Sequence, residues 1–315
     1  MAETVRVLRR AVITGPTGCV GNALIRLLLK QGIETIAIIR PGSPRAAELP
    51  CSPLLGVVEC DVSQLSTLPA RLTSGADAFF HFAWAHTIGP GRNDMPAQIS
   101  NIQYTIDACR AAAELGCQVF VGAGSQAEYG RSHSALTPDT PCFPENGYGI
   151  AKLCAGQMSR LECAHLGVDH IWPRILSIYG PHDGESTLIS FVIDRLLDGQ
   201  CPALTAGTQM WDYLYAEDAA KALLLMAQRG QNGAVYPLGS GTARPLREYV
   251  CLLRDAINPE LPVGFGEIPY GPLQVMHLQA DLTALSRDTG FCPETDFKTG
   301  ISRTISWMRS HGRDE

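Results

Sequence analysis

Short apolar runs alternate along this chain with segments of helical spacing. The first run, Val5–Thr14, ends in four residues typical of a buried strand, and Val20–Gln31 then places leucines on one helical face. The clearest later helical patterns are Ala97–Leu115 and Gly147–Leu166. Further strands are predicted at Glu34–Ile39, Val57–Glu59, Ala78–Phe82, Val119–Gly122 and His170–Ile175. This alternation predicts an α/β fold with a doubly wound parallel sheet.

The regular alternation ends near residue 175. Pro- and Gly-rich patches follow at Tyr179–Pro181 and Leu261–Pro272. Since the length of 315 residues fits about two domains, we divide the chain into a larger and a smaller unit. We expect residues 1–175 to form a dinucleotide-binding Rossmann domain, to which residues 212–240 return. Residues 176–211 and 241–315 are then a smaller, partly discontinuous, C-terminal substrate-binding domain.

Composition excludes several classes of protein. With 45% hydrophobic and 18% charged residues the chain is not disordered, and a net charge of -6 argues against non-specific nucleic-acid binding. No run of 18 apolar residues predicts a membrane span, and Met1–Arg10 lacks the apolar core of a secretory signal. The eleven cysteines show no C-x-x-C and no zinc spacing. We therefore expect a cytoplasmic protein with no metal site and no disulfide framework.

Three glycines at a spacing of three residues lie between the first predicted strand and helix. Such a turn lets the backbone approach a pyrophosphate, which the N-terminus of the helix then attracts. The alternative is a plain glycine-rich turn, but the strand before it and the helix after it favour a dinucleotide site. The loop residues expected at the cofactor are Gly15, Thr17, Gly18, Cys19, Val20 and Gly21.

The end of the second strand bears on the choice of cofactor. A carboxylate there would bind the ribose 2′-hydroxyl of NAD(H), whereas an arginine suits the 2′-phosphate of NADP(H). The strand ends in Arg40, and no carboxylate is available at that point. We therefore predict a preference for NADP(H), with NAD(H) as the alternative if Arg40 is only a solvated charge. After the third strand, Asp61 and Val62 are placed to meet the adenine, although an aspartate that caps a turn has the same appearance.

A tyrosine and a lysine share one face of a predicted helix. Tyr148 and Lys152 are four residues apart, and a nearby ammonium group lowers the pKa of a phenol and favours acid/base chemistry. The alternative is an ordinary surface pair. Ser125 follows the fifth strand, at the edge of the sheet where ligands of such folds bind, and its hydroxyl can orient a reacting oxygen.

Together with three later runs, these motifs resemble an extended short-chain dehydrogenase/reductase. The runs are Ile178–Pro181, Asp212–Asp218 and Val235–Gly241, and the resemblance is to the NAD(P)-dependent epimerase/dehydratase group that acts on nucleotide-activated sugars. It implies that Tyr148 is the acid/base. By the same resemblance Lys152 binds the nicotinamide ribose and tunes Tyr148, and Ser125 holds the substrate oxygen. Besides Tyr148 and Lys152, the cofactor contacts it implies are Cys19, Val20, Asp61, Val62, Phe82, Ala83, Trp84, Asn101, Pro173 and Ile175.

The chain also departs from that group. Gln126–Ala127 stands where the 4,6-dehydratases carry two carboxylic residues, which argues against dehydration. Ser177 replaces an asparagine, Trp211 replaces an arginine that often meets the diphosphate, and an arginine expected before Ala280–Asp281 is absent. These departures put binding of an ordinary UDP-sugar diphosphate in question, while Trp211 is suited to stacking. The substrate-binding candidates are His86, Gln126, Ser177 and Trp211.

The context of these residues is most similar to deoxysugar 4-ketoreductases. We therefore predict an NADPH-dependent reductase of a keto group on a nucleotide-linked deoxysugar. The alternatives are a nucleotide-sugar 4-epimerase, a reductase of a non-sugar ketone or aldehyde, and a non-catalytic cofactor-binding protein. The resemblance further implies a homodimer formed by the helices after the fourth and fifth strands. Ala111–Ala113 and Ala151 are expected to allow close approach there.

Overall fold

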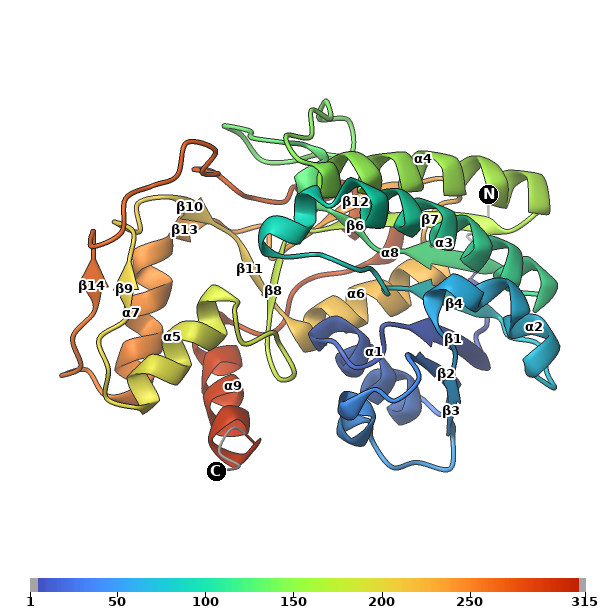
Figure 1. Cartoon of the computed structure of the whole chain (residues 1–315), viewed down its shortest axis with the longest axis horizontal. Helices are drawn as coiled ribbons and strands as arrows, with labels where there is room; N and C mark the ends of the chain where they lie inside the picture. Colours follow the sequence, from blue (N-terminus) through green and yellow to red (C-terminus); the bar gives the residue numbers. More distant parts are fainter. Residues whose placement is uncertain (1–4, 312–315) are drawn as a thin grey trace.

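A parallel β-sheet forms the centre of the molecule (Figure 1). The computed structural model describes residues 5–311. Neighbouring strands follow the order β12-β7-β5-β4-β1-β2-β3, and β6 pairs with β7. The strands are β1 (Arg10–Thr14), β2 (Glu34–Ile39), β3 (Leu55–Glu59), β4 (Ala78–His81), β5 (Val119–Gly122), β6 (Gly124–Ser125), β7 (Asp169–Ile175) and β12 (Val235–Leu238). The predicted doubly wound sheet is confirmed, although its first strand begins at Arg10 instead of Val5.

Helices cover both faces of this sheet. On one face α3 (Met95–Glu114) packs against α4 (Gly147–Leu166), and on the other α1 (Cys19–Lys30) packs against α6 (Ala216–Arg229) (Figure 1). Because successive strand residues point to opposite faces, Val12 joins the core under α3, whereas its neighbours Ala11 and Ile13 join the core under α1. Burial on both faces explains why the strands are apolar runs without polar alternation. Short helical elements at the sheet are η1 (Pro44–Glu48), η2 (Val62–Thr67), α2 (Leu68–Arg71), η3 (Gly89–Asn93), η4 (Gln126–Glu128) and α8 (Thr283–Thr289).

A second group of elements lies beyond the carboxyl ends of the strands (Figure 1). It contains α5 (Leu188–Leu197), α7 (Leu246–Ile257) and α9 (Phe297–His311), which share an apolar core. Three small strand pairs complete it: β8 (Ser177–Tyr179) with β11 (Tyr213–Tyr215), β9 (Ala203–Leu204) with β14 (Gly264–Phe265), and β10 (Met210–Trp211) with β13 (Arg244–Pro245). Residues 216–238, which form α6 and β12, belong to the layers of the large sheet. The proposed division into two domains stays a prediction.

The alanines assigned to a dimer contact face the interior of the chain. Ala111, Ala112 and Ala151 are buried, because α3 and α4 pack tightly against each other and against the sheet. The small side chains therefore serve contacts within the chain. The exposed faces of α3 and α4 carry larger apolar residues, among them Ile99 and Leu161.

The described residues also bear on the expectations from composition. All eleven cysteines are free thiols in the structure. Between residues 5 and 311, no helix is both long and apolar enough to cross a bilayer. Within the same range, no cluster of His, Cys, Asp and Glu has the arrangement of a metal site. Met1–Thr4, which begin the segment considered for a leader, lie outside the described range.

Candidate active site

The glycine turn joins β1 to α1 under tight steric limits. Gly15 has a φ of 69°, and a Cβ there would lie 2.8 Å from the backbone nitrogen of Ala83. A Cβ on Gly21 would lie 2.3 Å from the carbonyl oxygen of Gly15. A Cβ on Gly18, by contrast, would have one neighbour within 4 Å, the Gly15 oxygen at 3.8 Å. The turn thus has no free space next to Gly15 and Gly21, whereas there is free space next to Gly18, the N-cap of α1.

In the first turn of α1, no side chain competes with an anion for the backbone N–H groups. Gly18 is the N-cap and supplies no side-chain hydrogen bond, and no acidic residue lies in the first turn. The backbone N–H groups of Cys19 and Val20 therefore belong to a helix end that attracts anions. Burial, followed by the charge of Asp183, raises the pKa of the Cys19 thiol well above its ordinary value. Cys19 is consequently a neutral residue beside this N-terminus.

Arg40 and Asp61 lie at the ends of adjacent strands. Arg40 follows β2 and is exposed to solvent. Asp61 caps η2 by accepting hydrogen bonds from the backbone nitrogen and the hydroxyl of Ser63, at 2.9 and 2.6 Å. Those bonds, with a smaller contribution from Arg40, lower the pKa of Asp61. The structure thus shows the capping role that the sequence left open for Asp61, and it leaves the Arg40 side chain accessible. The neighbouring Val62 is half-buried.

Lys152 belongs to the second turn of α4, and its side chain is buried. Its Nζ donates a hydrogen bond of 2.6 Å to the carbonyl oxygen of Ala123 and lies 3.6 Å from the centre of the Trp84 ring. The same atom is 5.8 Å from the centre of the Tyr148 ring. Burial lowers the pKa of Lys152 to about 7, although the carboxylate of Glu128 acts in the opposite direction. The amine is therefore only partly protonated at neutral pH.

The structure brings Ser125 and Tyr148 together. Ser125 ends β6, and its side chain lies beside the Tyr148 phenol, where it acts as a hydrogen-bonding neighbour that lowers the pKa of Tyr148. Burial raises the pKa of Tyr148, while the bond to Ser125 and then the charge of Arg92 act to lower it. A serine hydroxyl and a tyrosine hydroxyl side by side can both bond one substrate oxygen. This arrangement suits proton exchange with a carbonyl or an alcohol.

A buried ion pair between Glu128 and Arg174 holds the backbone of Ser125. The Glu128 carboxylate accepts hydrogen bonds from the backbone nitrogen of Ser125 (2.8 Å), from Trp172 Nε1 (3.0 Å) and from Arg174 Nε (2.7 Å). Glu128 is fully buried. Burial opposes the charge of Arg174, yet Glu128 and Tyr129 raise the pKa of Arg174 above its ordinary value. Sequence reasoning missed Glu128, although Ser125-x-x-Glu128 has the spacing of a capping box, which the structure contains.

Two buried amides fix the loop between β4 and α3. Asn101 accepts from the backbone nitrogen of Ala85 and donates to its carbonyl oxygen, both at 3.0 Å. Gln98 accepts from Trp84 Nε1 at 2.9 Å and donates to the carbonyl oxygen of His86 at 3.0 Å. The amide of Asn101 is thus engaged by protein backbone. Asn101, assigned to the cofactor from the sequence, holds the loop that carries Trp84.

The same loop presents His86 and Arg92. His86 has a φ of 60°, unusual for a residue with a side chain, and its Nδ1 lies 3.2 Å from a carboxylate oxygen of Asp94. Arg92 places its guanidinium carbon 4.8 Å from the centre of the Tyr148 ring. Its Nε is buried and has no hydrogen-bond partner among the described residues. Arg92 was absent from the sequence-based candidates.

The remaining predicted site residues lie in the glycine turn, directly after β4, and on β7, β8, β10 and η4. Trp211 Nε1 donates a hydrogen bond of 2.8 Å to the hydroxyl of Ser177. Ile175 pairs with Ser125 across the sheet, so it too lies beside the serine. Pro173 is buried within the β7–β12 pair. Half-buried positions are taken by Gln126, Thr17, Phe82 and Ala83. The structure therefore brings Ser177 and Trp211 into contact, whereas Pro173 lies inside the sheet.

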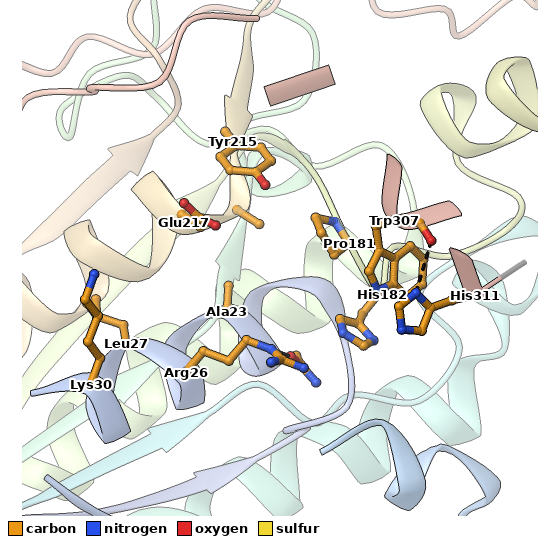
Figure 2. A pocket seen from close by; sticks show the side chains of 12 residues that line it. Ala23, Arg26, Leu27, Lys30, Pro181, His182, Tyr215, Glu217, Trp307 and His311 are labelled. Atoms are coloured by element: carbon orange, nitrogen blue, oxygen red, sulfur yellow. Dashed lines mark hydrogen bonds between the residues drawn. The ribbon is translucent and has the colours of Figure 1, made fainter. Parts of the chain in front are cut away.

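A separate hollow lies between α1, the start of α6 and α9 (Figure 2). Its volume is about 470 Å³. Arg26 and Lys30 line one side, while on the other the Trp307 and His311 rings stack at 5.1 Å (Figure 2). None of the residues assigned to the cofactor or substrate from the sequence lines this hollow. The site around Tyr148 is therefore a different place in the molecule.

Comparison with known proteins gives matches over most of the chain. A family model described as the NAD dependent epimerase/dehydratase family matches residues 11–239. A dTDP-glucose 4,6-dehydratase of Streptomyces griseus is 25% identical over 95% of this chain and 94% of its own. A UDP-glucose 4-epimerase of Azospirillum brasilense is 26% identical, with 98% and 95% covered.

Solved structures are similar over the same extent. A UDP-N-acetylglucosamine 4-epimerase from Methanobrevibacter ruminantium superposes with a TM-score of 0.87 at 21% identity, covering 96% of this chain and 98% of that one. A dTDP-glucose 4,6-dehydratase from Streptomyces venezuelae, determined with NAD bound, has a TM-score of 0.84 at 24% identity, with 96% and 97% covered. At this identity the structural likeness establishes the fold.

Proposed function

Because this chain belongs to the NAD dependent epimerase/dehydratase family, as its motifs suggested, we propose that it exchanges hydride between a nicotinamide dinucleotide and a carbon of a nucleotide-linked sugar. The chain is an enzyme, as its relatives are. The alternative of a non-catalytic binding protein is therefore set aside. The observation that carries the proposal is the contact between the Ser125 and Tyr148 hydroxyls, one helical turn from Lys152.

Each of the three side chains has a separate task in this proposal. Tyr148 gives its proton to the oxygen of a substrate carbonyl as the alkoxide develops, or removes one from an alcohol in the reverse direction. Ser125 donates a hydrogen bond to the same oxygen and fixes its position. Lys152 holds the ribose next to the nicotinamide. The nicotinamide, when bound, supplies or accepts the hydride.

We propose net reduction of a keto group as the reaction. Dehydration needs an acid and a base beside the serine, and the chain has Gln126 and Ala127 there. The adjacent carboxylate, Glu128, is buried and bonded to three donors. Epimerisation is the second candidate, since a UDP-glucose 4-epimerase is among the relatives. Loss of absorbance at 340 nm with a keto-sugar distinguishes net reduction from epimerisation, which consumes no cofactor.

The cofactor and substrate are assigned by the same reasoning. Accessible Arg40 at the end of β2 favours NADP(H), while a related structure contains NAD, so NAD(H) is the competing choice. Affinity for NADPH and for NADH measured on one preparation decides between them. A related structure with UDP-N-acetylmuramic acid bound supports a nucleotide sugar. A non-sugar ketone or aldehyde is the alternative, and it is supported by the absence of two arginines, one at Trp211 and one before Ala280–Asp281.

We further propose that the enzyme is a homodimer. The outer faces of α3 and α4 expose apolar side chains, and such a surface favours a protein partner. The association is measured by light scattering at several protein concentrations. The exposed residues of this face are Met95, Ile99, Ile150, Met158 and Leu161.

Replacing Tyr148 with phenylalanine tests the proposed chemistry. The variant Tyr148→Phe keeps the ring and removes the proton donor, so we expect kcat to fall by about 10²–10⁴-fold with cofactor affinity retained. The matched control is Tyr104→Phe on α3, a half-buried tyrosine outside the site, which should keep its rate. Full turnover by Tyr148→Phe on the substrate of the wild-type enzyme contradicts the proposed function.

A further inference from the structure

The hollow between α1, the start of α6 and α9 has the size of a small-molecule site. Its volume of about 470 Å³ lies in the range of about 300–1,000 Å³ that is usual for ligand pockets. The proposed reaction at Tyr148 uses none of its side chains. Its walls come from α1 and α6, which cover the large sheet, and from α9 of the second group of elements (Figure 2). The hollow therefore lies where these two parts of the fold meet.

The basic wall of the hollow is formed by α1. Arg26 and Lys30 are one helical turn apart, and both line the cavity. The buried amide of Asn22 accepts a hydrogen bond of 2.7 Å from Arg26 Nε, which fixes the direction of the guanidinium group. Figure 2 shows this group extending toward His182. Among residues 5–311, the two terminal nitrogens of Arg26 and the Nζ of Lys30 have no hydrogen-bond or carboxylate partner. They are thus available to a ligand.

The acidic groups near this wall are already paired. Glu217 is the one acidic residue that lines the hollow within the described range, and it forms an ion pair of 2.9 Å with Arg303. Glu48 reaches His182 from η1 and is also bonded to Arg45. In a chain with a net charge of -6, two unpaired cations that face one cavity favour an anionic ligand. The terminal nitrogens of a guanidinium group match the oxygens of a phosphate in particular.

The opposite wall of the hollow is aromatic. The Trp307 ring lies between the rings of His182 and His311, with centre-to-centre distances of 4.7 and 5.1 Å. The indole N–H groups of the other three tryptophans each donate to a side chain. That of Trp307 has no acceptor in the described part of the chain, so it can donate to a ligand. An aromatic wall with one free N–H donor suits a heteroaromatic ring that carries hydrogen-bond acceptors.

We propose that this hollow is a second ligand site, which binds a nucleoside phosphate. The phosphate lies at Arg26 and Lys30, and the base lies against Trp307 and His311. The inference is independent of the reaction proposed at Tyr148. Because the ligand contacts α1 and α9 together, it joins the helices that cover the sheet to the second group of elements.

Fluorine NMR of the full-length protein labelled with 5-fluorotryptophan locates a bound nucleotide. The chain has four tryptophans and so gives four signals, each assigned by a Trp→Phe replacement. Trp84 reports on the proposed cofactor site and Trp211 on the proposed substrate site, whereas Trp307 reports on the hollow. ADP is the probe. We expect it to shift the Trp307 signal along a saturation curve of its own, with a dissociation constant below about 1 mM.

Arg26→Gln tests the contact with the phosphate. At the Trp307 signal, ADP should bind about 10- to 100-fold more weakly, which corresponds to the loss of one hydrogen bond to a charged group. Lys30→Gln should weaken binding less, because a lysine makes no forked contact. The matched control is Arg9→Gln, which removes the same charge from an exposed arginine outside the hollow and should leave the curve unchanged. An unshifted signal of buried Trp172 confirms that each variant is folded.

Two further ligands decide which part of the nucleotide is recognised. Inorganic phosphate and adenosine should each need a concentration at least about 10-fold higher than ADP to shift the Trp307 signal. If either is as effective as ADP, the assignment to a nucleoside phosphate is refuted. An ADP titration that leaves Trp307 unshifted, or an equal affinity in Arg26→Gln, overturns the site itself. Full turnover by Tyr148→Phe refutes only the proposed function and leaves the Trp307 curve as it is.

Discussion

The proposed cofactor side, around the glycine turn and Ser125, and the proposed substrate side, around Ser177 and Trp211, are held together in different ways. On the cofactor side, the turn at Gly15 rests on the backbone of Phe82 and Ala83, and parallel strands fix both segments in one sheet. On the substrate side, β9, β10, β13 and β14 are two-residue strands. There a single side-chain bond, Trp211 to Ser177, joins β10 to β8.

This difference separates what is fixed from what can vary. The close backbone contact at Gly15 leaves no space for a side chain, so only glycine fits at this position of the turn. A side-chain bond between two short strands can be exchanged for another without disturbing the large sheet. We therefore expect substitutions on the cofactor side to affect folding and catalysis, and substitutions on the substrate side to affect mainly which ligand binds.

The largest effect is expected from the ion pair behind Ser125. Glu128→Ala leaves Arg174 buried without its partner, and breaking a buried pair in this way costs about 3–5 kcal/mol of the free energy of unfolding. Activity should fall as well, since the backbone of Ser125 loses its acceptor. Urea denaturation measures the loss. The control is Glu162→Ala, which breaks a more exposed pair with Arg110 and should cost far less.

A loss for Glu128→Ala no greater than for Glu162→Ala would contradict this view of the cofactor side. It would mean that the sheet, and not the buried pair, holds the end of β6. Retained activity in a destabilised Glu128→Ala protein would separate the two roles of Glu128. In that case the Ser125 hydroxyl would keep its position without the capping box.

A smaller effect is expected on the substrate side. Trp211→Phe keeps an aromatic ring and removes the hydrogen bond to Ser177, which is worth about 0.5–1.5 kcal/mol. The KM for the sugar substrate should rise by about 2- to 10-fold, which is this energy expressed as an equilibrium ratio. Cofactor affinity should not change. Trp307→Phe, in the hollow beside α9, is the matched control. If Trp211→Phe changed the KM for the sugar and the affinity for the cofactor equally, the separation of the two sides would be refuted.

The sequence predicts the helix that carries Tyr148 and Lys152 well because its signals are local. The limits of α4 at Gly147 and Leu166 coincide with the prediction. Asn146 caps the start of the helix and Gly167, with a φ of 72°, ends it. The capping box of Ser125 and Glu128 is just as local, and its spacing could have identified the glutamate. Features of this kind depend on neighbours within a few residues.

Other features depend on contacts between segments far apart in the chain. Arg92 reaches Tyr148 because a bond between η3 and α4 spans 54 residues, and no spacing in the sequence records it. Glu128 meets Arg174 across 46 residues. The alanines of α3 misled for a related reason. Small side chains predict a close helix contact but do not specify the partner, and here the partner is α4 of the same chain.

The smallest expected effect is a change in proton binding at Lys152. Its pKa of about 7 reflects burial without the cofactor, so the group is largely neutral above pH 7. An anionic dinucleotide beside it favours the charged form and raises this pKa. Cofactor binding at about pH 8 should therefore take up as much as about one proton. Calorimetry in buffers of different ionisation enthalpy measures the uptake. Lys152→Met should abolish it, whereas Lys221→Met, which removes a surface pair with Glu294, should not. Equal proton uptake by the wild type and Lys152→Met would show that another group titrates, and Lys152 would then be charged before the cofactor arrives.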